Sequence, residues 1–212
     1  MDTIRELDLA ENTYVIYTTD NGPWLQFKHH GGSAGPLREG KGTTFEGGQR
    51  VPCVVWGPGR IPAGTESDEL VGTIDLLPSI AAMTGTPLPE DKKIDGLDAS
   101  GILNGEAEKS PRSEFVYYTS RGDLEGLRQG KWKILVKKPN QGRGGKGAKG
   151  KGKGKGKAAP SPEILLFDLS TDVGEQNNLA EANPDVVKKL QARMQELDAE
   201  ITENARAPWL KE

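Results

Sequence analysis

Two short apolar runs without alternation constrain the fold of this chain more than any other feature. They are residues 14–18 (Tyr-Val-Ile-Tyr-Thr) and residues 51–56 (Val-Pro-Cys-Val-Val-Trp). A continuous run of β-branched and aromatic residues is typical of a strand that is buried on both faces of a parallel sheet. The runs therefore predict an α/β fold in which two buried strands are connected by a long, glycine-rich loop, residues 19–49.

The only cysteine of the chain, Cys53, lies in the second run. A single thiol cannot form an internal disulfide, and it lacks the partners of a metal or redox site. We therefore expect a buried structural thiol.

A helix is predicted over residues 76–84, with Asp75 as its N-cap and Gly85 just after its end. Its apolar side chains are expected to face a core. These are Leu76, Leu77, Ile80, Ala81 and Met83.

The pattern changes after residue 110 and predicts an antiparallel meander. The expected strands are residues 114–119, 124–128, 131–136 and 164–168, with a turn at Gln129-Gly130. Asn183 and Pro184 then begin a terminal helix whose apolar stripe should pack on these strands. The stripe comprises Val186, Val187, Leu190, Met194, Leu197 and Ile201.

The predicted fold class is therefore α/β: the C-terminal part of a large mixed sheet flanked by helices, followed by a small antiparallel sheet with a C-terminal helix. The corresponding domains are residues 1–110 and residues 111–212.

The charge balance argues against nucleic acid as the main partner, because 28 Lys and Arg oppose 31 Asp and Glu, a net charge of -3. No stretch approaches the ~20 apolar residues of a membrane-spanning helix, so no membrane partner is expected. The first residues also lack the features of a secretory signal.

Residues 140–160 form a tract in which lysines alternate with glycines and no acidic residue occurs. Such a composition cannot bury apolar surface, so we expect a disordered, solvated insertion. The alternative is an arm that binds polyanions, although no aromatic residue is interleaved to stack on bases.

Asp20 and Asn21 directly follow the first predicted strand. Ligands of open α/β sheets bind outside the carboxyl ends of strands, and a carboxylate beside an amide oxygen suits calcium or magnesium. The sequence Asp-Asn-Gly-Pro is equally suited to a plain turn, and these four residues alone favour the turn.

Lys41 stands between two glycines in the loop, and residues 35–41 fit the beginning of a phosphate-binding loop, G-x-x-x-x-G-K. The match fails at Gly42, where a Ser or Thr would hold magnesium, so what remains is a general anion site with exposed amides. His29 and His30 are adjacent rather than four residues apart, which makes them a poor metal pair.

Several segments occur together in a characteristic order along nearly the whole chain outside the Lys/Gly tract. They are residues 13–22, 32–48, 50–52, 74–78, 95–96, 130–133, 166–169 and 175–180. In this combination the chain resembles type I sulfatases of the arylsulfatase group, within the alkaline phosphatase superfamily.

The resemblance implies roles for four residues. Asp20 and Asn21 would be two ligands of a calcium ion, which reverses the preference for a plain turn. Lys41 would be catalytic and contact the sulfate, and His30 would contact the substrate, an aryl or carbohydrate sulfate ester. Arg38, Glu46 and Arg50 are expected to form ion pairs that fix the loop. Members of this family are usually periplasmic or secreted.

The sequence departs from the family at the nucleophile, a formylglycine formed from the Cys or Ser of a C-x-P-x-R motif. Cys53 is followed by Val-Val-Trp, and no such motif occurs. We therefore expect a sulfuric ester hydrolase represented by its C-terminal half, inactive alone, with the formylglycine and further calcium ligands in a missing N-terminal half. The alternatives are an inactive remnant, a polyanion-binding protein, or a phosphate or phosphonate ester hydrolase.

Overall fold

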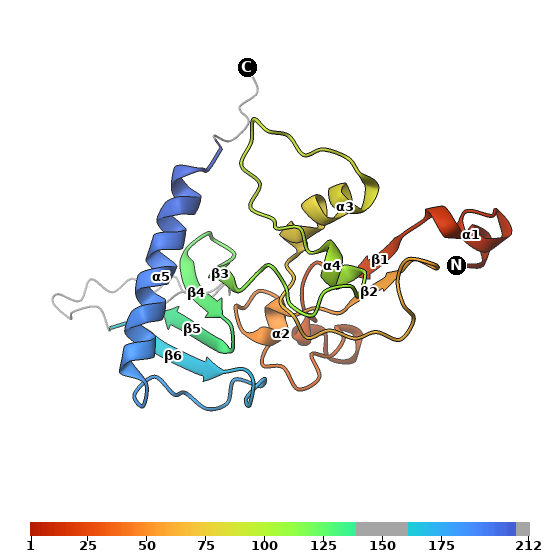
Figure 1. The fold of residues 1–212 in the computed structure, drawn as a ribbon. Helices are drawn as coiled ribbons and strands as arrows, with labels where there is room; N and C mark the ends of the chain where they lie inside the picture. Colours follow the sequence, from red (N-terminus) through yellow and green to blue (C-terminus); the bar gives the residue numbers. More distant parts are fainter. Residues whose placement is uncertain (139–160, 207–212) are drawn as a thin grey trace, which may run out of the picture. The chain divides into compact units, whose positions relative to one another are not determined.

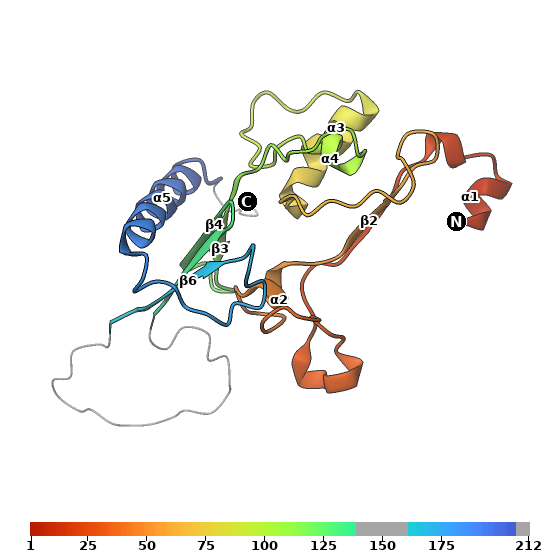
Figure 2. The same cartoon turned by 60° about the horizontal axis from the view of Figure 1, so that its bottom comes forward.

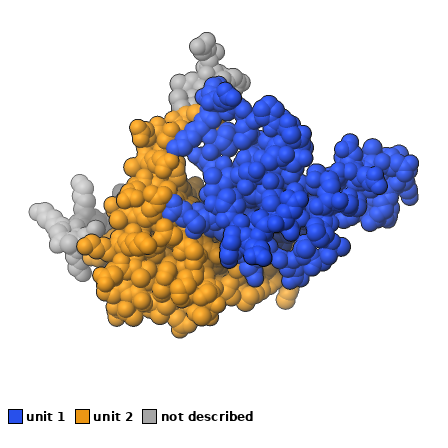
Figure 3. All heavy atoms as spheres, viewed as in Figure 1, with its two compact units in different colours: residues 1–20, 51–115 blue, residues 21–50, 116–212 orange. Residues whose placement is uncertain are grey.

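The structure is a computed structural model that describes residues 1–138 and 161–206. The Lys/Gly tract lies outside the described residues, and so does the prediction made for it. The chain divides into two compact units, residues 1–20 with 51–115 and residues 21–50 with 116–212 (Figure 3). The boundary expected near residue 110 stays a prediction, and the loop that carries Lys41 belongs to the same unit as the C-terminal half of the chain.

Unit 1 contains short helices and one two-stranded ribbon (Figure 1). Its elements are α1 (Asp2–Glu6), η1 (Ala10–Asn12), β1 (Val15–Thr18), β2 (Cys53–Trp56), η3 (Thr73–Asp75), α3 (Leu76–Thr84) and α4 (Ser100–Leu103). The ends of α3 agree with the prediction, and Gly85 ends it in the left-handed conformation at φ 65°.

The two apolar runs are strands, but the prediction that they belong to a parallel arrangement is wrong for this pair. β1 and β2 pair antiparallel, with Val15 opposite Trp56 and Thr18 opposite Cys53. Nothing in an apolar run specifies strand direction, because side chains alternate in the same way in both types of sheet.

Much of this ribbon is also less buried than the sequence indicates. Tyr17 and Val54 are 63% and 61% exposed, and Cys53 is exposed rather than buried. Leu77 and Ile80 of α3 are likewise exposed, so the expectation that they face a core is wrong in this structure. Each strand of the ribbon has one hydrogen-bonded partner among the described residues, so its other edge carries no strand there.

Unit 2 contains the predicted meander, a sheet of order β3-β4-β5-β6. Its strands are β3 (Glu114–Tyr118), which begins at the end of unit 1, β4 (Leu124–Gln129), β5 (Trp132–Lys137) and β6 (Glu163–Asp168). Gly130 has a positive φ of 57° in the tight turn between β4 and β5, where a glycine is favoured. The antiparallel prediction is confirmed for β4-β5 and β5-β6.

The predicted terminal helix is α5 (Pro184–Glu203), which packs on one face of this sheet (Figure 2). Leu190 and Met194 are buried there against Leu127, Ile134 and Leu166, as the apolar stripe predicts. Asn183 does not cap the helix with its side chain, which instead donates to the Leu179 carbonyl at 3.0 Å. No helix among the described residues is long and apolar enough to cross a bilayer.

The opposite face of the sheet is covered by a loop that leads into the short helix α2 (Glu46–Gln49). Phe45 packs there in a second apolar cluster. The other members are Leu135, Leu165, Phe167 and Leu169. Because successive residues of a strand point to opposite faces, Ile134 contributes to the α5 side and Leu135 to the loop side.

Candidate functional site

The segment that carries Lys41, residues 38–48, is named the lysine loop here. Its backbone closes on itself, because the Gly47 amide donates to the Arg38 carbonyl at 2.8 Å and the Thr43 hydroxyl donates to the Gly40 carbonyl at 3.0 Å. A Cβ at position 47 would collide with the Arg38 and Glu39 carbonyls, so this close approach requires glycine. The loop therefore has a defined shape that presents Lys41 at its surface.

Lys41 lies beside an aromatic segment of the same unit. Its amide donates to the Pro23 carbonyl at 2.9 Å, and its ammonium group lies 5.4 Å from the centre of the Trp24 ring. The Trp24 ring meets the Phe27 ring edge to face, with 4.4 Å between the ring centres. Phe27 belongs to η2 (Leu25–His30), which Trp24 directly precedes. A hollow of about 130 Å³ is lined by these neighbours: Trp24, Leu25, Gln26, Glu39, Gly40 and Lys41. An exposed cation next to apolar surface suits an anion that carries an organic group.

The inner side of the lysine loop is bound to the sheet by three consecutive residues. The Thr44 hydroxyl donates to Glu125 at 2.5 Å and accepts from Lys137 at 2.9 Å. Phe45 enters the apolar cluster described above, and Glu46 forms a buried ion pair with Lys133 at 2.8 Å. The exposed and the anchored sides of the loop are thus distinct.

A second carboxylate completes this buried charge cluster. Glu175 lies 2.9 Å from the Lys133 ammonium group and accepts a hydrogen bond from the Glu46 amide at 2.7 Å. Lys133 and Glu175 are fully buried. Burial raises the pKa of Glu175 above its ordinary value, while the charge of Lys133 and the Glu46 amide act in the opposite direction.

The predicted loop-fixing ion pairs are found in part. Glu46 forms such a pair, whereas Arg38 acts through a hydrogen bond to the Glu175 carbonyl at 2.8 Å and by stacking 4.0 Å from the Phe45 ring centre. Lys133 and Glu175 were not singled out by sequence reasoning. The available signal was Lys133 itself, a charge on the face of β5 that also carries the apolar Leu135.

Asp20 and Asn21 follow β1 directly, with Asp20 exposed and Asn21 half-buried. Their carboxylate and amide oxygens fit the preference of calcium for oxygen ligands. Within residues 1–138 and 161–206, no group of three or more His, Cys, Asp or Glu side chains could hold a metal ion. The pair fits a calcium site only as part of a larger set of ligands.

His30 ends η2 and is exposed, as is His29. Among the described residues, the six that line the hollow beside Lys41 do not include either histidine. The assignment of His30 as a substrate contact stays a prediction.

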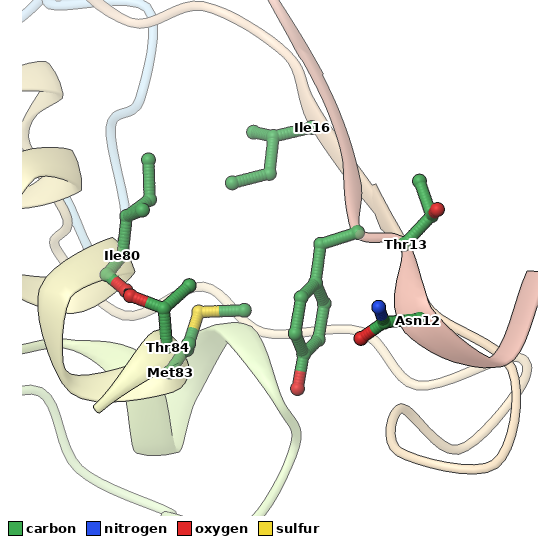
Figure 4. A pocket seen from close by; sticks show the side chains of 7 residues that line it. Asn12, Thr13, Ile16, Ile80, Met83 and Thr84 are labelled. Atoms are coloured by element: carbon green, nitrogen blue, oxygen red, sulfur yellow. The ribbon is translucent and has the colours of Figure 1, made fainter. Parts of the chain in front are cut away.

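A larger cavity of about 340 Å³ lies within unit 1, between β1 and α3. Ile16 from β1 faces Ile80 and Met83 from α3 across it (Figure 4). Its remaining lining residues are Asn12, Thr13, Tyr14 and Thr84. None of the lining residues carries a charge at neutral pH, so the cavity offers no cation to pair with an anion.

Comparisons with known proteins identify the family of the chain. Residues 1–86 match the family model for sulfatases, and residues 110–208 match the model described as the C-terminal region of aryl-sulfatase. Together the two matches extend over most of the chain. The chain belongs to the sulfatase family. Human arylsulfatase A is 39% identical across 95% of this chain, and mouse steryl-sulfatase is 34% identical across 85%.

Solved structures support the sulfatase fold. A structure described in connection with the metabolism of glycosaminoglycans by Bacteroides thetaiotaomicron superposes with a TM-score of 0.74 at 27% identity, covering 94% of this chain and 41% of that one. The PsFucS1 sulfatase from Pseudoalteromonas sp. gives a TM-score of 0.75 at 24% identity, with coverage of 98% and 41%. The chain likewise spans about 41% of human arylsulfatase A and 31% of mouse steryl-sulfatase.

Proposed function

We propose that this chain contributes the lysine loop to a sulfate ester hydrolase, in which Lys41 binds the sulfate group of the substrate. The observation that carries the proposal is the presentation of an exposed Lys41 by a loop whose other side is fixed to the sheet, in a member of the sulfatase family. A preorganised cation is worth most where negative charge develops during a reaction, because it needs no rearrangement at that moment.

The expected nucleophile, a formylglycine, belongs to a C-x-P-x-R motif that the 212 residues do not contain. Its place would be in residues outside this sequence, and the chain alone would lack a covalent route to hydrolysis. The part of the reaction assigned to this chain is therefore binding and charge stabilisation by Lys41, with the substrate contact of His30 as a further proposal.

The organic part of the ester is proposed to be an aryl or carbohydrate group that contacts Trp24. Rings of both kinds stack on exposed tryptophan faces, and the Trp24 ring adjoins the Lys41 ammonium group in the same hollow. The names arylsulfatase A and steryl-sulfatase, borne by two relatives, are in keeping with a ring-bearing substrate.

The rival hydrolase activity within the superfamily is toward phosphate or phosphonate esters. Sulfatase and phosphatase activity are distinguished by comparing kcat/KM for an aryl sulfate and an aryl phosphate that have the same leaving group. The enzyme for this comparison is a polypeptide that joins this chain to an upstream segment bearing a processed C-x-P-x-R motif. The proposal requires preference for the sulfate. The polyanion-binding alternative depends on the Lys/Gly tract, which lies outside the described residues.

Calcium is proposed to bind through Asp20 and Asn21 together with ligands outside the 212 residues. In the chain alone, titration calorimetry should therefore find weak binding, with a Kd of about 1 mM or higher, because two ligands fall far short of the six to eight oxygens that calcium prefers. Asp20→Ala is the matched variant and should abolish the residual heat. Micromolar affinity, or unchanged binding by Asp20→Ala, would contradict this assignment.

A further inference from the structure

One face of β5 matches the lysine loop residue by residue. Lys133, Leu135 and Lys137 point to the same face, since they are alternate residues of one strand. Lys137 bonds Thr44, Leu135 shares an apolar cluster with Phe45, and Lys133 pairs with Glu46. Three consecutive loop residues thus meet three successive positions on one strand face, which fixes the register of the loop on the sheet.

Lys133 differs from the other two contacts because it joins two segments through charge. It binds Glu46 of the lysine loop and Glu175 of the segment after β6, and its ammonium group also lies 4.7 Å from the Tyr117 ring centre. Arg128 lies 3.9 Å from the Glu46 carboxylate, so two cations balance two anions within the cluster. The cluster is therefore charge-neutral as a unit.

Hydrogen bonds around the cluster also connect it to the segment of the lysine loop that carries Lys41. Glu46 precedes Gly47, whose amide bonds the Arg38 carbonyl, and the Arg38 side chain returns to the Glu175 carbonyl. Glu175 has a positive φ of 52°, a strained conformation for a residue with a side chain, which persists only where surrounding contacts enforce it. These bonds close a ring that encloses the base of the lysine loop.

We propose that Lys133 is a positioning residue that holds the lysine loop, and with it Lys41, in the geometry for sulfate binding by bridging Glu46 and Glu175. The inference rests on the proposed function, because it takes Lys41 as the group being positioned. Buried ion pairs are poor general stabilisers, since desolvation offsets their attraction, whereas charged hydrogen bonds fix direction strongly. The apolar packing of Phe45 already attaches the lysine loop to the sheet, and the ion pairs of Lys133 fix the orientation of the loop on it.

The test uses the full 212-residue chain and two matched variants, Lys133→Met and Lys131→Met. Lys131 precedes the same strand and pairs at 2.5 Å with Asp168, which is not a residue of the lysine loop, and its side chain is half exposed. Amide hydrogen exchange is measured by NMR at Glu46 and Gly47, and at the amides of β6. The indole N–H resonance of Trp24, assigned with Trp24→Phe, reports the position of the Lys41 ammonium group.

In Lys133→Met, the Glu46 and Gly47 amides should exchange about 10- to 100-fold faster, the range for losing a hydrogen bond to a charged group. The β6 amides should keep their protection, and the Trp24 indole resonance should move. Lys131→Met should change neither the loop amides nor that resonance. Unchanged loop exchange, or equal loss of protection in the loop and in β6, would overturn the proposal, since the latter indicates general destabilisation.

Lys133→Met leaves two buried carboxylates with one cation, so it can fail to fold. The double variant Lys133→Met/Glu175→Gln removes one charge of each sign and leaves Glu46 opposite Arg128. It should fold and still show fast loop exchange, and loop protection at the level of the wild-type chain would refute the role of Lys133. Neither the exchange measurement nor the Trp24 resonance involves sulfate. The role of Lys133 in holding the loop is therefore tested separately from the proposal that Lys41 binds sulfate.

Discussion

Replacing Lys41 by alanine should lower kcat/KM for a chromogenic aryl sulfate by about 10²- to 10³-fold, the range for removing one donor that stabilises developing charge. The measurement requires a polypeptide that joins this chain to an upstream segment with a processed C-x-P-x-R motif. The reason is the position of Lys41, exposed on a loop whose other side is anchored by Thr44, Phe45 and Glu46.

Two further variants sharpen this result. Lys41→Arg should restore little activity, because a planar guanidinium group does not replace a compact ammonium group. Lys188→Ala is the control, since it removes the same charge from an exposed position on α5, and it should leave kcat/KM unchanged. Full activity of the Lys41→Ala variant would show that Lys41 has no role in the reaction.

The second large effect concerns the stability of unit 1. Asp75 is fully buried and accepts two hydrogen bonds from Arg112, at 2.7 and 2.6 Å, and two from the backbone amides of Gly72 and Leu97. Arg112→Met leaves this carboxylate buried without its cation. The free energy of unfolding should fall by about 3–5 kcal/mol, as found when one member of a buried ion pair is removed.

Urea unfolding, followed by circular dichroism, measures this loss, and hydrogen exchange at the Gly72 and Leu97 amides places it in unit 1. Lys109→Met is the control, because Lys109 pairs with Glu69 at 3.2 Å on the surface with its side chain 86% exposed. It should cost less than about 1 kcal/mol. Equal losses in the two variants would show that burial does not strengthen the Asp75 pair.

The same pair gives a dependence on pH. Burial by itself raises the pKa of Asp75, but the bonds and charge of Arg112 and the two backbone amides outweigh burial and hold the pKa below its ordinary value. A carboxylate with a lowered pKa stabilises the folded state above its unfolded pKa, and this contribution is lost as the pH falls through the folded pKa. The difference between wild type and Asp75→Asn should therefore shrink in acid.

The antiparallel sheet and α5 could be predicted from sequence because their signals are local. Gly130 marks the tight turn, and Leu190 and Met194 repeat at helical spacing on the buried face of α5. The pairing of β1 with β2 could not be predicted, since 34 residues separate Thr18 from Cys53 and neither apolar run specifies direction. The exposure of Leu77 and Tyr17 could not be predicted either. An apolar residue in the sequence can be buried, but the sequence does not show which segment would cover it.

The candidate site divides in the same way. Lys41 and the Asp20-Asn21 pair were found because they lie in short motifs, and their roles remain proposals. Lys133 was missed because its partner Glu46 is 87 residues away, and only the folded chain brings a lysine of β5 against the lysine loop. Asp75 was predicted as the cap of α3, whereas its side chain instead bonds Gly72, Leu97 and Arg112.

The most direct test of the central claim is turnover of an aryl sulfate and of the matching aryl phosphate by the joined polypeptide, with the 212-residue chain measured alone in parallel. We expect kcat/KM to be higher for the sulfate ester and no turnover of either ester by the chain alone, because the chain supplies Lys41 without a nucleophile. Preference for the phosphate ester, or turnover of the sulfate ester by the chain alone, would contradict the assignment.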